Sequence, residues 1–327
     1  MRSPAVLATF LLLLFAWPAA VAQQLPPTLE RSVPERPLEI TVDRRLCGRE
    51  GIYVQVLGAS AGELDDGQAS TGYLVWVDGR ARILVDAGPG TALRFEESGA
   101  DFRDLYAMVF TQTHPQHTAD LPAFVMGSIW AGRSEDLPIF GPAGNDREPG
   151  FEDWLELIMG PTGAYRNLAD VFSSLSQAGY RIQPTEIDTT GRATWTGFRR
   201  DRIRLSSVGT DHGNQPALAW RVDVDGIGIT FTGSTANRRQ LVNDLAAGSV
   251  ILVAHHAIPE NTRGFRREQF MTPSQIGRLA ADAGVNRLVL SHRSARTRGR
   301  ETQSRDEIRN HFRGSVVFAS DLNCWRT

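Results

Sequence analysis

The sequence predicts an α/β fold in which two β-sheets pack together and helices cover their outer faces. In both halves of the chain, short β-rich runs with turn signals between them are followed by alternating helical and strand patterns. The composition is that of an ordinary globular protein, with 41% hydrophobic and 22% charged residues. A formal net charge of −2 gives no sign of a polyanionic partner.

The N-terminus has the features of a secretory signal peptide, which we assign to residues 1–22. An apolar run from Ala5 to about Trp17 follows a single arginine, and a small-x-small cleavage site ends at Ala22. The run is too short to span a bilayer comfortably, and neither a stop-transfer pattern nor a cysteine for lipidation follows it. We therefore expect an exported protein, periplasmic or extracellular, without a membrane anchor.

The mature chain divides into a short lead-in and one domain. Residues 23–50 are polar and rich in proline, which predicts an extended segment. Residues 51–327 show no break in composition, so we expect them to form a single domain.

The first half of this domain begins with a meander of strands. We expect strands at 53–60, 72–79, 80–90 and 104–113, with a hairpin turn at VDGRAR. Apolar residues at helical spacing then predict helices at 119–132, 151–160 and 167–179.

The second half repeats this order. Strands are expected at 201–210, 216–226 and 227–235. Alternating elements follow, with helices at 238–248, 272–284 and 307–314 and strands at 249–257, 285–293 and 315–321. The helix at 272–284 has the clearest signals, with Thr272 as N-cap, Pro273 in the first turn and Gly284 at its end.

The two cysteines of the chain, Cys47 and Cys324, lie near opposite ends of the mature protein. In an oxidising compartment they could form a disulfide, worth at most about 4–5 kcal/mol on the chain-entropy model. Two separate buried thiols are the alternative. The sequence favours the disulfide but does not show that the two side chains meet.

Four of the seven histidines occupy one kind of position, directly after a predicted strand. Because strand ends on one edge of a sheet layer converge, we expect these imidazoles to share a cleft. Histidine is the commonest metal ligand and can also act as an acid or a base, although each of these side chains taken alone could be structural. They are His114, His117, His212 and His292.

Six motifs stand out by their order and spacing. They are LVDAGPG (84–90), FTQTHPQHTADLPAF (110–124), DHGNQPALAWRV (211–222), ITFTGST (229–235), ILVAHHA (251–257) and MTPSQIGRLAADAGVNRLVLSHR (271–293). Together they resemble the metallo-β-lactamase superfamily, in the branch of ribonuclease Z-like and arylsulfatase-like hydrolases. The resemblance covers about Tyr53 to Asp321. It implies a four-layer αβ/βα sandwich of two mixed β-sheets flanked by helices.

The resemblance also shows that the metal motif is altered. The family motif is H-x-H-x-D-H, and here Gln112 stands at its first histidine and Gln116 at its aspartate. Ser234 stands where a carboxylate normally bridges two metal ions. The remaining ligands that the resemblance implies are His114, His117, His212 and His292.

These replacements argue against a pair of zinc ions. Two such ions repel each other strongly at low dielectric, and the family offsets this repulsion with two carboxylates and a bridging hydroxide. Here both carboxylates are exchanged for uncharged groups, and a glutamine oxygen is a poor zinc ligand. Two alternatives stay open: one zinc or other divalent ion among the four imidazoles, or a metal-free pocket of hydrogen-bonded His and Gln side chains.

Several neighbours could support the site. By the resemblance, Asp86 lies behind the ligands, and Asp120 either orients a ligand or caps a helix. Two residues are candidates for catalytic roles: Asp211, which directly precedes a presumed ligand, and His256, at a position where relatives often carry Glu.

Two basic segments, 261–270 and 292–305, flank the expected cleft. Arg263 and Arg293 are candidate contacts for an anion, and a solvated Arg-rich surface is the alternative. Few aromatic residues interleave with these arginines, which disfavours nucleic-acid binding.

Two functions are therefore compatible with the sequence. One is an exported hydrolase with at most one metal ion, which would cleave an ester or phosphoester with metal-bound water. The other is a non-catalytic binding or scaffold protein that holds no metal. Either protein would take a small molecule as substrate or ligand. The arginines would suit an anionic one. The resemblance also allows a homodimer.

Overall fold

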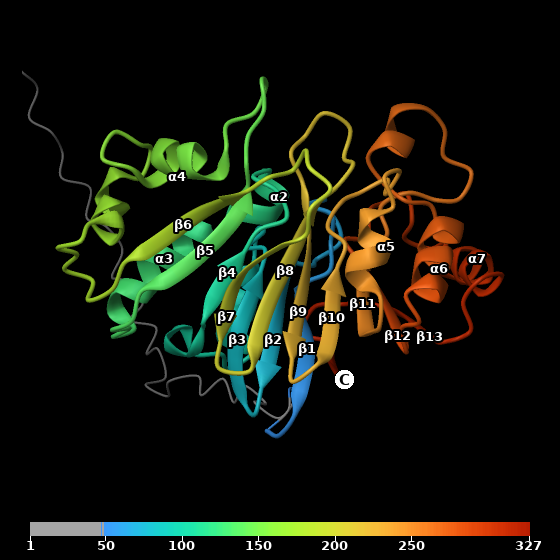
Figure 1. The fold of residues 1–327 in the computed structure, drawn as a ribbon, viewed down its shortest axis with the longest axis horizontal. Coiled ribbons are helices and arrows are strands. Elements are labelled where there is room, and N and C mark those ends of the chain that lie inside the picture. The colour runs from blue at the N-terminus through green and yellow to red at the C-terminus, as the bar shows by residue number, and fades with distance from the viewer. Residues whose placement is uncertain (1–46, 48) are drawn as a thin grey trace, which may run out of the picture. The chain divides into compact units, whose positions relative to one another are not determined.

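The computed structural model describes residues 47 and 49–327, so the assigned signal peptide and most of the lead-in lie outside the described residues. The described residues belong to one compact unit. Two seven-stranded sheets form its centre. In Figure 1, α3 and α4 lie on one side of the strands, and α5, α6 and α7 lie on the other. This arrangement confirms the predicted sandwich of two mixed sheets flanked by helices.

The first sheet has the strand order β14-β1-β2-β3-β4-β5-β6. The strands β1, β2 and β3 are antiparallel, whereas β3 to β6 run parallel, so the sheet is mixed. Its strands are β1 Ile52–Gly58, β2 Gly72–Val77, β3 Arg80–Val85, β4 Ala107–Val109, β5 Leu137–Pro142, β6 Ile182–Ile187 and β14 Cys324–Arg326.

The second sheet has the order β13-β12-β11-β10-β9-β8-β7 and repeats this pattern. Its antiparallel part runs from β7 to β10, and its parallel part from β10 to β13. Its strands are β7 Trp195–Arg200, β8 Ile203–Gly209, β9 Leu218–Val224, β10 Ile227–Phe231, β11 Ser249–His255, β12 Arg287–Ser291 and β13 Ser315–Phe318.

The helix predicted from Thr272 begins where the sequence signals placed it. Thr272 and Gln275 form a capping box at the start of α6, because each side chain bonds to the other's backbone N–H. The α-helices are α1 Thr91–Glu97, α2 Pro115–Thr118, α3 Leu121–Trp130, α4 Phe151–Met159, α5 Leu241–Ala246, α6 Pro273–Asp282 and α7 Glu301–Arg309. The 3-10 helices are η1 Phe102–Asp104, η2 Arg166–Phe172 and η3 Gly264–Glu268. None of the helices described is both long and apolar enough to cross a membrane.

Several elements differ from the prediction. The strands β5, β6, β7 and β14 and the helices α1 and α2 were not predicted. The helix expected at 167–179 is the shorter η2, and the helix expected at 307–314 is α7, which spans Glu301–Arg309. The sequence of β5 is LPIFGP, in which two prolines and a glycine resemble a loop. The strands β6 and β7 lie at the edges of their sheets, where exposed residues weaken the alternation of apolar and polar side chains.

Buried apolar side chains divide into three groups that match four layers. One group joins the inner faces of the two sheets, and Val75 of β2 and Val222 of β9 belong to it. The other groups lie between the first sheet and α3 and α4, and between the second sheet and α5 to α7. Two hydrogen bonds connect the sheets next to the expected site: Trp220 Nε1 donates to the Phe110 carbonyl at 3.0 Å, and Leu218 N donates to the Thr111 carbonyl at 2.9 Å.

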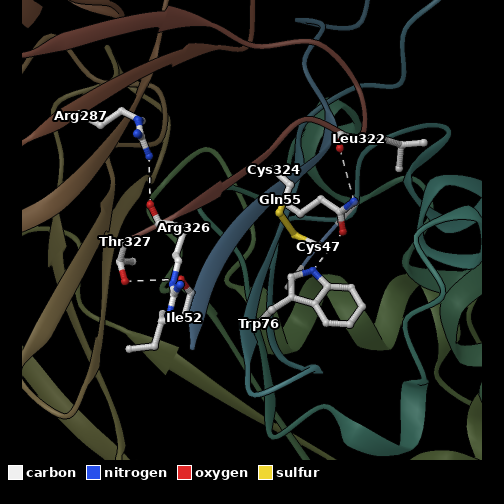
Figure 2. The surroundings of a disulfide bond; sticks show 9 residues. All are labelled: Cys47, Ile52, Gln55, Trp76, Arg287, Leu322, Cys324, Arg326 and Thr327. Carbon is white, nitrogen blue, oxygen red and sulfur yellow. Dashed lines mark hydrogen bonds between the residues drawn. A yellow bond between two sulfur atoms is a disulfide. The ribbon is translucent and has the colours of Figure 1, made fainter. Parts of the chain in front are cut away.

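Cys47 and Cys324 are joined by a disulfide, with their Cα atoms 5.7 Å apart (Figure 2). Cys324 begins β14, which pairs with β1. Beside the bond, the buried Gln55 accepts from Trp76 Nε1 at 3.0 Å and donates to the Leu322 carbonyl at 3.4 Å. The C-terminal strand is thus held by a covalent bond and by a hydrogen-bonded side chain.

Removal of this disulfide is expected to lower stability. The variant Cys47→Ser/Cys324→Ser should lose about 2–5 kcal/mol of unfolding free energy, because the unfolded chain is no longer closed into a loop. Urea unfolding of both proteins, with and without reductant, measures the loss. Reductant should destabilise the wild type alone, and equal stability of all four samples would contradict the expectation.

Candidate functional site

A buried aspartate fixes the loop that carries two of the predicted ligands. Asp86, which follows β3, accepts from the backbone N–H and from the hydroxyl of Thr111, at 2.7 and 2.8 Å. Its Oδ2 lies 2.9 Å from Nδ1 of His117, and both side chains are fully buried. A carboxylate accepts hydrogen bonds, so Nδ1 of His117 carries the proton and Nε2 presents a lone pair. Among the described residues, that Nε2 has no hydrogen-bond partner.

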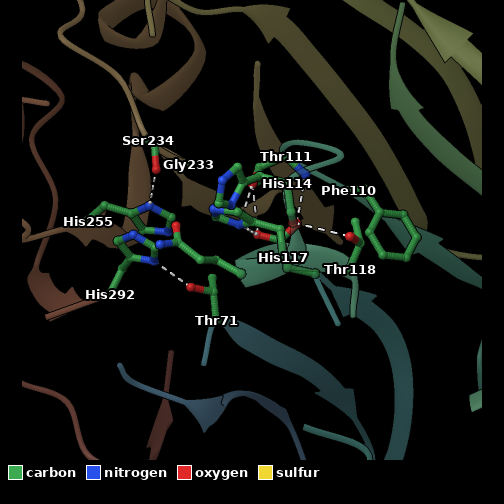
Figure 3. Close-up of polar contacts among 12 residues, drawn as sticks. Thr71, Phe110, Thr111, His114, His117, Thr118, Gly233, Ser234, His255 and His292 are labelled. Atoms are coloured by element: carbon green, nitrogen blue, oxygen red, sulfur yellow. Dashed lines mark hydrogen bonds and ion pairs between the residues drawn. The ribbon is translucent and has the colours of Figure 1, made fainter. Parts of the chain in front are cut away.

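Three buried imidazoles stack beside one another. They are His117, His255 at the end of β11, and His292 after β12. The rings of His255 and His292 have centroids 4.3 Å apart and planes 9° apart, and His117 lies 5.7 and 5.3 Å from them with planes within 20°. Figure 3 shows that these rings come from different segments and meet in one cluster. We call this cluster the imidazole stack.

Hydroxyl groups hold two rings of the imidazole stack. Nδ1 of His292 lies 2.5 Å from the Thr71 hydroxyl, and Nδ1 of His255 lies 3.1 Å from the Ser234 hydroxyl (Figure 3). Nε2 of His255 lies 3.4 Å from the Tyr73 hydroxyl. Both ring nitrogens of His255 therefore face hydroxyl groups, and this ring has no nitrogen left for another partner.

The other two predicted ligands, His212 and His114, lie outside the imidazole stack. Nδ1 of His212 donates to the Gln269 carbonyl at 2.7 Å, and the edge of the ring faces Phe270, with centroids 5.1 Å apart. Its Nε2 therefore presents a lone pair. His114 is the N-cap residue of α2 and stands exposed at the mouth of the cleft.

Burial lowers the pKa of four of the histidines described so far. Burial lowers the pKa of His212 to about 4. Burial, together with the charge of neighbouring histidines, holds the pKa values of His255 and His292 well below the usual range. Burial also lowers the pKa of His114, more modestly. At neutral pH the rings of His212, His255 and His292 are thus uncharged.

Two neighbouring cavities open at the cleft. The first, which we call the polar chamber, has a volume of about 260 Å³, and the second, the ring chamber, about 220 Å³. Gln112, His114 and Gln215 line both. The polar chamber is further lined by Glu63, Gln116, His212, Arg266, Gln269, Phe270, His292 and Arg296, among others.

Comparison with known proteins identifies the family. Residues 81–293 match the model of the β-lactamase superfamily domain. The chain belongs to the metallo-β-lactamase superfamily. This confirms the resemblance that the six motifs carried, and it places the protein among hydrolase folds related to ribonuclease Z.

The relatives in this superfamily match over most of their length. A protein named Ribonuclease Z from Pseudomonas putida F1 is 27% identical over 311 residues, which covers 81% of this chain and 94% of the relative. The metallo-β-lactamase fold protein YhfI from Bacillus subtilis covers 85% of this chain and 100% of its own, with a TM-score of 0.65 and 19% identity. The short form of human tRNase Z gives a TM-score of 0.64 and 16% identity, with 84% and 98% covered. At these identities the two solved structures show a shared fold.

The metallo-β-lactamase fold brings the predicted ligands together but points His256 elsewhere. Its Nε2 lies 2.9 Å from the Ser304 hydroxyl, on the side of α7. The neighbouring His255, which the sequence analysis did not select, joins the imidazole stack instead. Consecutive residues of a strand face opposite sides of the sheet, so only one of this pair can reach the cleft. The alternation of inward and outward side chains along β11 could have identified His255 from the sequence.

Asp211 and Asp120 also make other contacts. Asp211 is held by Arg239, with 2.8 Å from Nε to Oδ1, and lines a separate cavity of about 490 Å³. It therefore does not replace the lost carboxylates. Asp120 accepts from Ala92 N at 2.9 Å, so it caps the start of α1 and does not orient a histidine.

The two arginines selected as anion contacts lie outside the polar chamber. Arg293 pairs with Glu301 and stands over the ring of Phe318, and Arg263 is an exposed residue before η3. Arg266 and Arg296, from the same two basic segments, line the chamber in their place.

The donor set does not fit a metal centre of the superfamily's kind. A metal ion lies in the plane of each imidazole that binds it, and the near-parallel planes of the imidazole stack share no such point. Across residues 49–327, no group of three His, Cys, Asp or Glu side chains is placed to hold one ion. Two of the carboxylate positions are filled by Gln116 and Ser234, which add no charge.

Acidification is expected to destabilise the protein. His212 has a pKa of about 4 and His256 a pKa of about 3, both below the ordinary value of 6.5, because burial disfavours the charged ring. The unfolded chain therefore binds protons first, and stability is lost as pH falls below about 6.5, by about 1.4 kcal/mol per pH unit for each such histidine.

Urea unfolding between pH 7.5 and 5 measures this slope. The variant His256→Gln should reduce it by the share of one histidine. His311→Gln, a substitution of an exposed histidine, serves as the control. A wild-type stability that is constant over this range would contradict the expectation.

Proposed function

We propose that this protein is an exported, metal-free ligand-binding member of the metallo-β-lactamase superfamily. The imidazole stack carries the proposal, because its near-parallel rings do not converge on a common point. Ser234 occupies the position of the bridging carboxylate in relatives. Its hydroxyl bonds to His255 instead and so belongs to the hydrogen bonding within the cluster.

Charge supports the same conclusion. A zinc pair needs negative ligands to offset its repulsion, and here Gln116 and Ser234 are neutral. Asp86 is already engaged by Thr111 and His117. Burial disfavours the protonated form of His255 and His292. A buried cluster of such uncharged rings needs no counter-charge.

The proposed export rests on the signal-peptide features of residues 1–22 and on the disulfide. Disulfides persist in oxidising compartments, and Cys47 is bonded to Cys324. Cleavage near Ala22, read by mass spectrometry of protein from the culture medium or periplasm, tests this part of the proposal. Full-length protein that remains in the cytoplasm would contradict it.

Metal analysis tests the central claim. The mature protein, purified after growth with added zinc, should contain far less than one metal ion per chain by elemental analysis. It should not hydrolyse phenyl phosphate, a phosphodiester, an aryl sulfate or a β-lactam reporter. Stoichiometric metal, with turnover that is lost in His212→Ala, would overturn the proposal.

A hydrolase with one metal ion is the second candidate. The Nε2 of His117 has no partner within the described part of the chain, and Asp86 binds Nδ1. This favours the second candidate, because a carboxylate commonly orients a metal-binding histidine in this way. The relatives named Ribonuclease Z extend its test to RNA and bear against the expectation that nucleic acid is not a partner. Cleavage of a tRNA precursor by metal-loaded protein, abolished in His117→Ala, would establish this candidate.

A further inference from the structure

The polar chamber holds buried polar atoms of opposite kinds. Gln112 is only 2% exposed, and its Nε2 donor has no partner among the residues described. Glu63 accepts from Ala295 N through Oε1 at 2.9 Å, while its Oε2 is buried and unpaired within the same set of residues. Both side chains line the chamber. Unpaired buried groups are costly, so a ligand that both accepts and donates hydrogen bonds would stabilise them.

Charge in the polar chamber narrows the kind of ligand. Arg266 and Arg296 line it together with the single carboxylate of Glu63. A ligand with an anionic group would meet the arginines and the Gln112 amide. A cationic donor would meet Glu63, and hydrogen bonds between charged groups are about twice as strong as neutral ones. His212 adds a further acceptor through Nε2, since its Nδ1 donates to Gln269.

The ring chamber combines apolar and polar walls. It is lined by Trp154 of α4 and by three prolines, Pro115, Pro149 and Pro216, together with the polar residues Gln112, Thr113, His114, Glu148 and Gln215. The indole is partly buried, and its ring runs parallel to that of Phe151, with centroids 6.0 Å apart. Proline side chains lose almost no entropy when a ligand orders them, so this wall is rigid before binding. A flat aromatic ring fits such a surface.

We propose that the two chambers together bind a zwitterionic aromatic amino acid. Its carboxylate meets Arg266, Arg296 and Gln112, its ammonium meets Glu63, and its ring lies between Trp154 and the prolines. Each chamber is smaller than the roughly 300–1,000 Å³ of pockets for drug-sized ligands, which agrees with a small molecule. The inference rests on the proposed ligand-binding function and names the class of its ligand.

Calorimetric titration of the mature protein with four probes tests the inference. L-phenylalanine has all three groups, L-alanine lacks the ring, 3-phenylpropanoate lacks the ammonium, and 2-phenylethylamine lacks the carboxylate. We expect L-phenylalanine to bind at least about tenfold more tightly than each of the others, the loss expected for one charge-assisted hydrogen bond or one buried ring. Absence of L-phenylalanine binding, or equal binding of L-alanine, would overturn the inference.

Two variants assign the contacts. Glu63→Gln should weaken L-phenylalanine about tenfold and leave 3-phenylpropanoate unchanged, since only the ammonium is affected. Glu96→Gln, an exposed change on α1, is its control. Equal weakening of both probes by Glu63→Gln would refute the predicted ammonium contact and with it the amino-acid class.

Trp154→Leu should reduce the affinity for both aromatic acids, whereas Trp154→Phe should retain most of it. Trp130→Leu is the matched control, because Trp130 on α3 is 81% exposed and lines neither chamber. Since Trp154 also packs on the core, the melting temperatures of all variants are recorded. If Trp154→Leu does not fold, the affinity of Trp154→Phe decides the test. Unchanged affinity in folded Trp154→Leu would place the ring elsewhere and overturn the inference.

The metal content of the same preparation separates the two proposals. Stoichiometric metal with hydrolysis would overturn the metal-free function, whatever the titrations show. A metal-free, inactive protein that does not bind L-phenylalanine would be consistent with the metal-free function. It would overturn only the proposed amino-acid ligand.

Discussion

The variant Gln112→His/Gln116→Asp/Ser234→Asp is expected to bind zinc where the wild type does not. It restores the ligands that the superfamily motif specifies, and its two new carboxylates supply the missing negative charge. Without metal, the carboxylate at position 234 would be buried at a site only 1% exposed, so the variant should be less stable than the wild type. Zinc should reverse this loss.

Thermal unfolding with and without zinc, together with elemental analysis, measures the gain. The variant Gln112→Ala/Gln116→Ala/Ser234→Ala is the control, since it changes the same positions without adding ligands. A restored variant that folds but binds no zinc would show that the alignment of these positions with the family motif is wrong.

Asp86→Ala is expected to be the most destabilising single substitution near the cleft. It would leave the backbone N–H and hydroxyl of Thr111 and the Nδ1–H of His117 without their buried acceptor. Each unsatisfied donor costs about 1–3 kcal/mol, so the loss of all three contacts is expected to cost about 3–9 kcal/mol. Urea unfolding measures it, and Asp86→Asn should lose less because one acceptor oxygen remains.

A second aspartate provides the matched control. Asp225 has φ 52° and Asp86 φ 58°, so alanine meets the same left-handed backbone strain at both positions. Asp225 lies in the exposed turn between β9 and β10, with half of its side chain in solvent. If Asp225→Ala were as destabilising as Asp86→Ala, backbone strain and not lost hydrogen bonding would explain the result.

The fold could be predicted from the sequence where local and long-range signals agree. Asp78 and Asp225 each precede a glycine at a turn, and both residues of each pair have positive φ, as the two VDG turns predicted. The capping box of Thr272 was equally visible. The strand β5 could not be predicted, because its prolines suggest a loop. Only its pairing with the parallel neighbours β4 and β6 makes it a strand.

The candidate site could be predicted in its members but less well in its geometry. The histidines after β4, β8 and β12 meet because strand ends converge at one edge. Which of His255 and His256 reaches the cleft depends on the face of β11 that is turned inward. Asp211 is paired with Arg239, which lies 28 residues away in the sequence. Such contacts are set by tertiary packing, and neighbouring residues in the sequence do not reveal them.

The position of β14 has a consequence for biogenesis. β1 is an early strand, yet its outer partner contains residues 324–326 of a 327-residue chain. Until the last residues emerge, the backbone groups along that edge of β1 stay open to pairing with another chain, which is a known route to aggregation. Loss of a few C-terminal residues should therefore impair the yield of folded protein more than their small contact area suggests, because it would remove both the covering strand and its cysteine.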